Sequence, residues 1–424
     1  MIRRFAHGRA YVWGFVDQGF SSATNLALTL LAGRALGPAG LGIVVVGLSA
    51  YLVALGLQRA LLTTPLVSAS AALPFDERSL AVRRGLTIVL TGASGAALVV
   101  VLLGLIVPGD VGLGFLVVGA WLLPALVQDF WRVVLFQEER PGAAAANDAC
   151  WAVAMAIAAP LAWLSGTVWA IVGCWGAGAL AGALIGLLQT RVRPDSLRHA
   201  YSWWRTRLWP FGRWLGAEGI VYGVASAATV LLLYALLGAK ALGGLRAAQT
   251  LFATLTFILP ALSLPGLPAL TRVLAVSARA AMGLAMRLSV LVAGLASLYV
   301  AAVLILGGRL IPYVFGGSFN AFTDLALPIG TWQLLGALGA GFTLLLTAQQ
   351  RGRDLATVLI ASSAMSTAFV SLLAWRSGVT GAAWGFAIGA GVTTALTIWL
   401  ACHSQGLSAG GVDRRGAEPG VVDV

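Results

Sequence analysis

The chain has 424 residues, of which 59% are hydrophobic and 10% are charged, and its formal net charge is +12. Because soluble proteins have about 25% charged residues, this composition excludes an ordinary soluble enzyme. The arginines stand in short segments between apolar runs, which favours the loops of a membrane protein over a surface that binds nucleic acid.

Apolar segments recur from one end of the chain to the other. A helix needs about 20 predominantly apolar residues to cross the hydrocarbon core of a bilayer. The sequence therefore predicts an all-α polytopic membrane protein with about 12 transmembrane helices. They are expected near residues 11–33, 40–63, 86–107, 112–136, 143–164, 167–189, 214–237, 247–266, 288–307, 322–347, 355–375 and 380–401.

The predicted helices fall into two groups of six. We expect an N-terminal six-helix bundle at 1–189 and a C-terminal six-helix bundle at 214–401, followed by a disordered cytoplasmic tail at 402–424. The linker at 190–213 is basic and rich in tryptophan, a composition that suits a segment lying at the headgroup level of a membrane. A simple topology anchor between the two halves is the favoured reading of this linker.

The positions of the basic residues predict the orientation. Alternate linkers, together with both termini, hold 20 Lys and Arg residues, whereas the other set of linkers holds five. Cytoplasmic loops carry the excess of positive charge, so both termini are expected in the cytoplasm of a bacterial inner membrane. The basic N-terminus continues into a first span without a small-residue cleavage site, which indicates a retained helix.

An internal repeat emerges when the chain is shifted by 201 residues. Gly37 then lies over Gly238, Gly42 over Gly243, and Asp17 over Glu218. Six predicted spans separate the two copies, so equivalent residues return to the same side of the membrane. The two halves are therefore expected to be parallel repeats around an axis along the membrane normal.

Each half opens with a helix that has one polar face. An ionised side chain facing lipid costs roughly 2.5–3.5 kcal/mol at the bilayer centre. The two polar faces are therefore expected to line a shared, water-filled central cavity between the bundles. Their members are Asp17, Ser21, Thr24 and Asn25 in the first half and Glu218, Tyr222, Ser226 and Thr229 in the second.

Charged side chains within the spans are candidates for ion pairs or for substrate contacts. Arg59 lies at a depth close to that of Asp17. Two roles are therefore considered for Arg59: a salt bridge with Asp17 and a contact with an anionic headgroup. Asp129 and Arg132 are spaced i,i+3 on one helix, which favours a local ion pair.

On the predicted external side, Arg246 and Gln249 open the eighth span and Arg34 closes the first. Snorkelling to the interface explains such arginines without a function. The alternative is a ring of arginines that meets phosphate, because the planar guanidinium donates two hydrogen bonds at once. The three cysteines and three histidines show no ligand spacing, so no metal site is expected.

The sequence resembles the polysaccharide-flippase branch of the multidrug/oligosaccharidyl-lipid/polysaccharide (MOP) exporter superfamily. The resemblance is carried by "FVDQGFSSATNLALTLLAGRALGPAGLGIV", "LGLQRALLTTPLV" and "LGGLRAAQTLFATLTFILPALSLPGLPAL". It implies two six-helix bundles facing a cavity, which export an undecaprenyl-diphosphate-linked oligosaccharide by alternating access. The cavity residues implied by the resemblance or by the polar faces are Asp17, Asn25, Arg59, Glu218, Tyr222, Arg246 and Gln249.

The chain departs from the family pattern in three respects: the eighth span lacks the earlier proline that the family pattern has, no lysine lies within the membrane, and Glu218 has no arginine partner because Pro260 stands at the repeat position equivalent to Arg59. We expect a non-enzymatic flippase for cell-surface polysaccharide assembly, without a cofactor and with Na⁺ or H⁺ as a candidate coupling ion at Asp17 or Glu218. The expected partners are membrane lipids, the lipid-linked oligosaccharide, and a glycosyltransferase or polymerase of the same pathway, with no nucleic acid.

Two alternatives remain. The first is a cation-coupled multidrug exporter of the same superfamily, whose cavity would be dominated by acids. The second, less favoured, is a membrane glycosyltransferase or ligase. Such enzymes need a sizeable external loop with catalytic groups, but the longest predicted external linker is residues 308–321, and no paired carboxylates occur on the outer loops.

Overall fold

The computed structural model describes most of the chain. The described residues are 2–70, 73–255, 266–267, 269–306, 309–349 and 351–409. Side chains lie outside the description at 2–18, 214–215, 217–222, 352–356, 359 and 404–409. Every secondary-structure element in the described ranges is helical, which confirms the all-α prediction.

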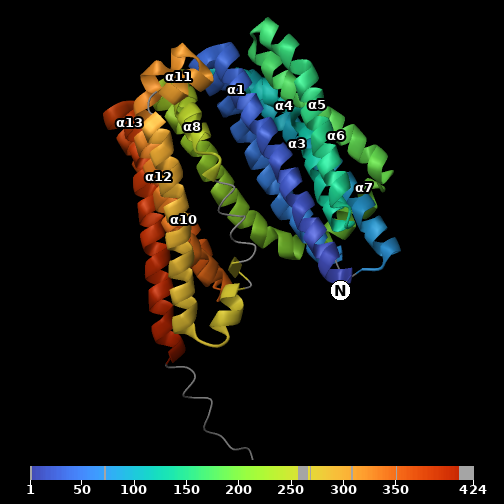
Figure 1. Cartoon of the computed structure of the whole chain (residues 1–424). Helices are drawn as coiled ribbons and strands as arrows, with labels where there is room; N and C mark the ends of the chain where they lie inside the picture. Colours follow the sequence, from blue (N-terminus) through green and yellow to red (C-terminus); the bar gives the residue numbers. More distant parts are fainter. Residues whose placement is uncertain are drawn as a thin grey trace, which may run out of the picture. The chain divides into compact units, whose positions relative to one another are not determined.

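The chain divides into two compact units, which are described separately here. The first comprises Met1–Thr250 with Ile311–Phe322, and the second Leu251–Leu310 with Thr323–Val424. Elements of the first unit are α1 (Ile2–Gln58), η1 (Arg59–Thr63), α2 (Thr64–Ser70), α3 (Phe75–Ile106), α4 (Gly109–Gln137), α5 (Pro141–Ser165), α6 (Val168–Thr190), α7 (Leu197–Trp203), η2 (Trp204–Leu208), nearly all of α8 (Trp209–Leu251), and most of α11 (Leu310–Phe315) and η4 (Gly317–Leu325) (Figure 1). The second unit contains α10 (Ala278–Leu306), α12 (Ala326–Ala348) and α13 (Gly352–Ala409).

Within the described residues, nine helices are long and apolar enough to cross a membrane. Two of them, Gly19–Ser70 and Ile360–His403, have 52 and 44 residues, about twice the length that one crossing needs. Each contains a break in its helical backbone, at Gly37 and at Ser377 and Gly378, where the sequence predicted a boundary between two spans. The total of 12 stays a prediction.

Large apolar side chains cover the outside of these helices. A water-soluble monomer rarely exposes apolar patches on this scale, whereas a bilayer accommodates them. Strongly exposed leucines and isoleucines include Leu105, Ile106, Ile157, Leu161, Leu164, Leu188, Leu298 and Ile305.

The backbone shows the 201-residue repeat at two glycines. Gly37 in α1 has φ 69° and ψ −173°, and Gly238 in α8 has φ 78° and ψ 172°. Only glycine adopts this region readily, because a Cβ atom would clash with the backbone. The same residue type therefore kinks the chain at the same position of each repeat.

Just beyond these kinks, α1 and α8 touch through small residues. A Cβ atom on Gly42 would lie 2.0 Å from the carbonyl oxygen of Ala239, and one on Gly243 would lie 1.8 Å from that of Pro38. Since Gly243 is the repeat equivalent of Gly42 and Ala239 that of Pro38, the two contacts are the same contact made twice. This arrangement has local two-fold symmetry, and the parallel orientation of the two repeats stays a prediction.

The segment Ile311–Phe322 packs on α1 and α8. Phe315 and Phe319 are fully buried, and their rings are 5.3 Å apart between centroids. Phe315 covers Gly33, and Phe322 covers Gly244. A short helical pair that the sequence predicted as an external linker is thereby part of the first unit.

Close helix contacts also form the rest of the fold. In the first unit, Gly47 faces the carbonyl group of Gly114 on α4. In the second unit, Gly341 on α12 faces the carbonyl group of Ala285 on α10, and its N–H donates to Ser289 Oγ at 3.0 Å. Small residues let membrane helices approach at backbone distance.

The element ends differ from the predicted ones at several places. Helix α3 begins at Phe75 instead of near 86, and α10 begins at Ala278 instead of near 288. The linker predicted at 190–213 is largely helical, because α7 and η2 occupy 197–208 and α8 begins at Trp209. Helix α13 continues to Ala409, beyond the predicted last residue 401. The predicted division into bundles at 1–189 and 214–401 stays a prediction.

Candidate functional site

The site begins at η1, where the helix that contains Arg59 changes its hydrogen-bond register. Pro65 has no N–H, so it cannot donate to the carbonyl group of Leu61, four residues earlier. The chain forms one π-helical turn here, in which the Thr64 N–H bonds to the Arg59 carbonyl oxygen. The Leu61 carbonyl oxygen instead accepts a hydrogen bond of 3.0 Å from Trp204 Nε1 of η2.

Glycines bring the start of α8 against this turn. Gly212 lies against the Leu61 carbonyl oxygen and the Pro65 ring, and Gly216 lies against the Leu61 side chain. Any larger residue at Gly216 would place its Cβ atom 2.5 Å from a Leu61 methyl group. The π-turn that presents Arg59 is therefore held from outside α1 by α8 and η2.

Arg59 is joined to Asp129 on α4. Arg59 Nη2 lies 2.5 Å from Asp129 Oδ1, and Arg59 Nε donates to Asp129 Oδ2 at 3.3 Å. The Asp129 side chain is only 5% exposed, whereas that of Arg59 is 47% exposed. A buried carboxylate thus fixes one edge of a guanidinium whose other edge remains accessible.

A buried polar network continues from Asp129 along α4. Its neighbour Gln128 donates from Nε2 to Asn147 Oδ1 at 3.1 Å and to Asp148 Oδ1 at 2.7 Å. Asn147 Nδ2 donates to the carbonyl oxygen of Gly182 on α6 at 2.8 Å. Arg132 Nε lies 3.6 Å from Asp148 Oδ2. The network therefore ties α4, α5 and α6 into one rigid support for the Arg59 pair.

These contacts revise the local ion pair that the spacing favoured. Asp129 and Arg132 are three residues apart, but the structure joins each of them to a residue on another helix, Arg59 and Asp148 respectively. The Arg59–Asp17 alternative concerns a side chain outside the described residues, and the partner that the structure gives Arg59 is Asp129.

The polar face of α1 forms hydrogen bonds with its own backbone. Thr24 Oγ1 donates to the Ser21 carbonyl oxygen at 2.9 Å, and Thr29 Oγ1 donates to that of Asn25 at 2.9 Å. The exposed Asn25 donates from Nδ2 to the Ser21 carbonyl oxygen at 2.9 Å. Its Oδ1 atom remains available as an acceptor on the surface of α1.

The predicted residues of α8 are only partly described. Arg246 and Gln249 are half-buried, and within the described residues the Arg246 guanidinium makes no hydrogen bond or ion pair. The side chains of Asp17, Glu218 and Tyr222 lie outside the described residues, although their backbones belong to α1 and α8. No hydrogen bond in the described part joins Asn25, Arg59, Arg246 and Gln249 to one another.

Two members of the network, Gln128 and Asn147, were missed by sequence reasoning. Each directly precedes an acid, giving the pairs Gln128-Asp129 and Asn147-Asp148. One pair is near the end of a predicted span and the other is near the start of the next, so the two pairs meet across the turn. Two amide–acid pairs on either side of one predicted turn would have indicated this network.

The described residues contain no group of three or more His, Cys, Asp or Glu side chains that could hold a metal ion. Chemically, the arrangement offers an anchored and accessible cation. Arginine has five N–H donors, and Asp129 engages two of them. The remaining donors can bind an anion such as a phosphate group in a bidentate manner.

No family model and no curated protein matches the sequence. Solved structures match it closely in fold. An inward-facing multidrug resistance MATE family transporter of the MOP superfamily has a TM-score of 0.72 and 13% identity, covering 96% of this chain and 100% of that chain. The lipid II flippase MurJ in an inward closed conformation has a TM-score of 0.66 and 10% identity, covering 92% of this chain and 87% of that chain.

A third match is a MOP superfamily transporter from Pyrococcus furiosus Vc1, described as having a binding pocket of reverse polarity. Its TM-score is 0.54 at 13% identity, and it covers 94% of this chain and 95% of that chain. The chain therefore has the fold of the MOP-superfamily membrane transporters. The matches to both MATE and MurJ structures establish this fold class without selecting a branch.

Proposed function

We propose that the protein is a transporter that flips a polyprenyl-diphosphate-linked oligosaccharide from the inner to the outer leaflet by alternating access, for cell-surface polysaccharide assembly. One observation carries the proposal: the Arg59 guanidinium is held by the buried Asp129 while nearly half of its side chain stays exposed. The likeness in fold to a lipid II flippase supports it.

The chemistry of a diphosphate fits this arrangement. Its oxygens accept paired hydrogen bonds from a guanidinium, and such charge-assisted bonds are about twice as strong as neutral ones. Asp129 keeps Arg59 oriented before the substrate arrives, which lowers the entropy lost on binding. Asn25, Arg246 and Gln249 are proposed as further cavity residues that contact the diphosphate and its sugars.

A cation-coupled multidrug exporter is the second candidate, because a MATE transporter matches this fold over its full length. The described charges favour the flippase. Asp129 and Asp148, the two described acids within the helices of this network, each lie beside an arginine, so neither offers an uncompensated negative charge to a cationic drug.

The rest of the proposal follows the sequence. Asp17 or Glu218 would carry Na⁺ or H⁺ as the coupling ion, and both termini would lie in the cytoplasm of a bacterial inner membrane. The partners would be membrane lipids and the glycosyltransferases or polymerase that make and use the lipid-linked oligosaccharide.

The test is transport by the purified full chain in proteoliposomes. A fluorescent polyprenyl-diphosphate sugar is loaded, and a membrane-impermeant quencher reports the fraction that reaches the outer leaflet with time. Losing one charge-assisted contact of about 1.5–3 kcal/mol predicts that Arg59→Ala slows flipping by about 10-fold or more. Arg59→Lys retains the charge but not the paired geometry, so its flipping rate should lie between those of wild type and Arg59→Ala.

Arg376→Ala is the matched control, because Arg376 is an exposed arginine next to the break of α13. It should flip at the wild-type rate. Flipping by Arg59→Ala at that same rate would contradict the proposal. The proposal would also be contradicted if the proteoliposomes transport a cationic dye but do not flip the diphosphate lipid.

A further inference from the structure

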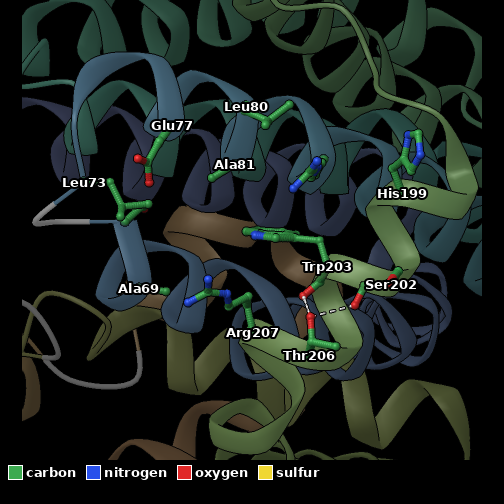
Figure 2. A pocket seen from close by; sticks show the side chains of 12 residues that line it. Ala69, Leu73, Glu77, Leu80, Ala81, His199, Ser202, Trp203, Thr206 and Arg207 are labelled. Carbon is green, nitrogen blue, oxygen red and sulfur yellow. Dashed lines mark hydrogen bonds between the residues drawn. The ribbon is translucent and has the colours of Figure 1, made fainter.

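A pocket of about 710 Å³ lies between the α2–α3 turn and the segment formed by α7 and η2. Its volume is within the range of small-molecule sites. The indole of Trp203 reaches into the space between Leu80 and Ala81 of α3 and Arg207 of η2 (Figure 2). All the lining residues belong to the first compact unit, and none belongs to the Arg59 network.

The pocket carries charges of both signs. Two of its basic side chains already have partners: Arg84 Nε lies 3.1 Å from Asp195 Oδ2, and His199 Nδ1 lies 2.9 Å from Ser196 Oγ. Glu77 and Arg207 are exposed, and among the described residues their side chains form no ion pair or hydrogen bond. The pocket therefore offers one available carboxylate and one available guanidinium, which together match a zwitterion.

The apolar groups around the pocket place it at a membrane surface. Phe75, at the start of α3, and Leu197 and Tyr201 on α7 expose most of their side chains. Exposed arginines stand among them, at Arg198, Arg205 and Arg207. Aromatic and apolar groups interleaved with arginines are typical of segments at the level of the lipid headgroups. A ligand for this pocket is therefore expected to come from the membrane.

We propose that this pocket binds the headgroup of a zwitterionic, amine-bearing phospholipid. The phosphate accepts hydrogen bonds from the Arg207 guanidinium, and the ammonium group pairs with the Glu77 carboxylate. The Trp203 indole offers an aromatic face to the ammonium group. An anionic headgroup without an amine meets the Glu77 carboxylate with like charge, so Glu77 selects against it.

In a second pocket nearby, by contrast, the carboxylate already pairs with an arginine of the same pocket. It has a volume of about 320 Å³ and contains Arg140 and Glu138. Arg140 Nη1 lies 3.1 Å from Glu138 Oε2, and Arg140 Nη2 donates to the carbonyl oxygen of Gln189. Arg78 also lines this pocket and donates from Nη2 to the Leu73 carbonyl oxygen. Because the Glu138 carboxylate is paired with Arg140, this second pocket offers no free carboxylate to an ammonium group.

The test counts lipid adducts on the purified full chain by native mass spectrometry, in micelles with dioleoyl phosphatidylethanolamine or dioleoyl phosphatidylglycerol. Wild type should bind phosphatidylethanolamine at least about 5-fold more tightly than phosphatidylglycerol. Arg207→Gln should weaken binding of both lipids by about 5-fold. Glu77→Gln should weaken phosphatidylethanolamine only and so remove the preference.

The chain offers two matched controls. Arg205 stands on the same π-turn as Arg207 but does not line the pocket, and Asp76 adjoins Glu77 in the first turn of α3. Arg205→Gln and Asp76→Asn should leave the wild-type preference intact. Both acids also stabilise the N-terminus of α3 through the helix dipole. Asp76→Asn loses that stabilisation without removing a pocket residue, so it controls for this effect of Glu77→Gln.

The proposal is overturned if Arg205→Gln weakens binding as much as Arg207→Gln does, because a general surface charge then explains the binding. It is also overturned if wild type binds both lipids equally or if Glu77→Gln leaves the preference unchanged. Arg207→Lys, which keeps the charge, should retain more binding than Arg207→Gln. Since the readout is lipid binding, the result is independent of whether the protein flips an oligosaccharide.

Discussion

Gly42 and Gly243 face each other where α1 touches α8, with each glycine against the carbonyl group of the other's neighbouring turn. A Cβ atom built on Gly243 would lie 2.9 Å from the Gly42 backbone nitrogen. Because the contact residues are related by the 201-residue repeat, the two halves of the chain meet around a local two-fold axis at this point. The axis passes between two helices of the same compact unit.

This contact predicts that Gly42→Ala and Gly243→Ala both destabilise the protein. The added methyl group would lie 2.0 Å or less from a carbonyl oxygen, so the backbones must separate. Such overpacking costs about 1–3 kcal/mol or more. Thermal unfolding in detergent measures the effect. Gly92→Ala in α3 is the control, because its Cβ atom would meet nothing within 4 Å, and it should raise stability by about 0.5–1 kcal/mol.

The Trp204–Leu61 hydrogen bond predicts a coupling with Pro65. Trp204→Phe removes the donor and leaves the Leu61 carbonyl oxygen without a helix partner, at a cost of about 1–2 kcal/mol. Pro65→Ala restores an N–H that can donate to this oxygen. The cost of Trp204→Phe should therefore be smaller in the Pro65→Ala background, as a double-mutant cycle of unfolding free energies measures. Equal costs in both backgrounds would disprove the coupling.

The Arg59–Asp129 pair predicts a stability effect separate from transport. Asp129→Asn leaves Arg59 without its counter-charge. Surface pairs contribute about 0–1 kcal/mol and broken buried pairs cost about 3–5 kcal/mol. Since Arg59 is half exposed, we expect a loss of about 1–3 kcal/mol. The double variant Arg59→Gln with Asp129→Asn should be more stable than the sum of the two single changes predicts; additive losses would contradict this.

Asp195 predicts a dependence of stability on pH. The Ser196 backbone N–H at 2.7 Å and the Arg84 side chain hold the pKa of this carboxyl group, which lies in the linker, below its ordinary value. A lowered pKa stabilises the fold above the unfolded value of about 3.9, and this contribution is lost as the pH falls through the folded pKa. The difference in unfolding free energy between wild type and Asp195→Asn should thus be constant above about pH 5 and shrink below about pH 4.

Arg84→Gln is the control for this pH effect, because it removes one of the two groups that lower the pKa of Asp195. In its background the folded pKa of Asp195 lies closer to the unfolded value, so the difference should be smaller at neutral pH and should finish shrinking at a higher pH than in wild type. Stability differences that are the same from pH 7 to pH 3 would rule out a contribution from the Asp195 carboxylate.

Hydropathy and glycine placement made most of the fold predictable. The spans predicted at 112–136 and 143–164 differ by only a few residues from α4 (Gly109–Gln137) and α5 (Pro141–Ser165). The Gly37 and Gly238 kinks, at equivalent positions of the predicted repeat, lie just beyond the predicted ends of the first and seventh spans at residues 33 and 237. These features are local, because apolar length sets a span and a positive φ requires glycine.

The ion pairs were less predictable because partners are chosen by packing between helices. A sequence gives the depth of Arg59 in its span but not which neighbouring helix faces it, so the pairing of Arg59 with Asp129 was missed. The folding of Ile311–Phe322 onto the first unit was also missed. Its anchor is Arg34, which donates from Nε to the Val314 carbonyl oxygen at 2.6 Å and from Nη2 to that of Tyr313 at 2.8 Å. Every residue has a backbone carbonyl group, so the sequence does not indicate which of them accepts a hydrogen bond from an arginine.

The symmetric contact of α1 with α8 has a consequence for the origin of the chain. Each half contributes both the small residue and the carbonyl group that a partner needs, so one half is complementary to a copy of itself. Such a surface is what a two-fold homodimer uses. A gene that encoded a single half would have made a protein able to pair with its twin, and tandem duplication followed by fusion would preserve that pairing within one polypeptide.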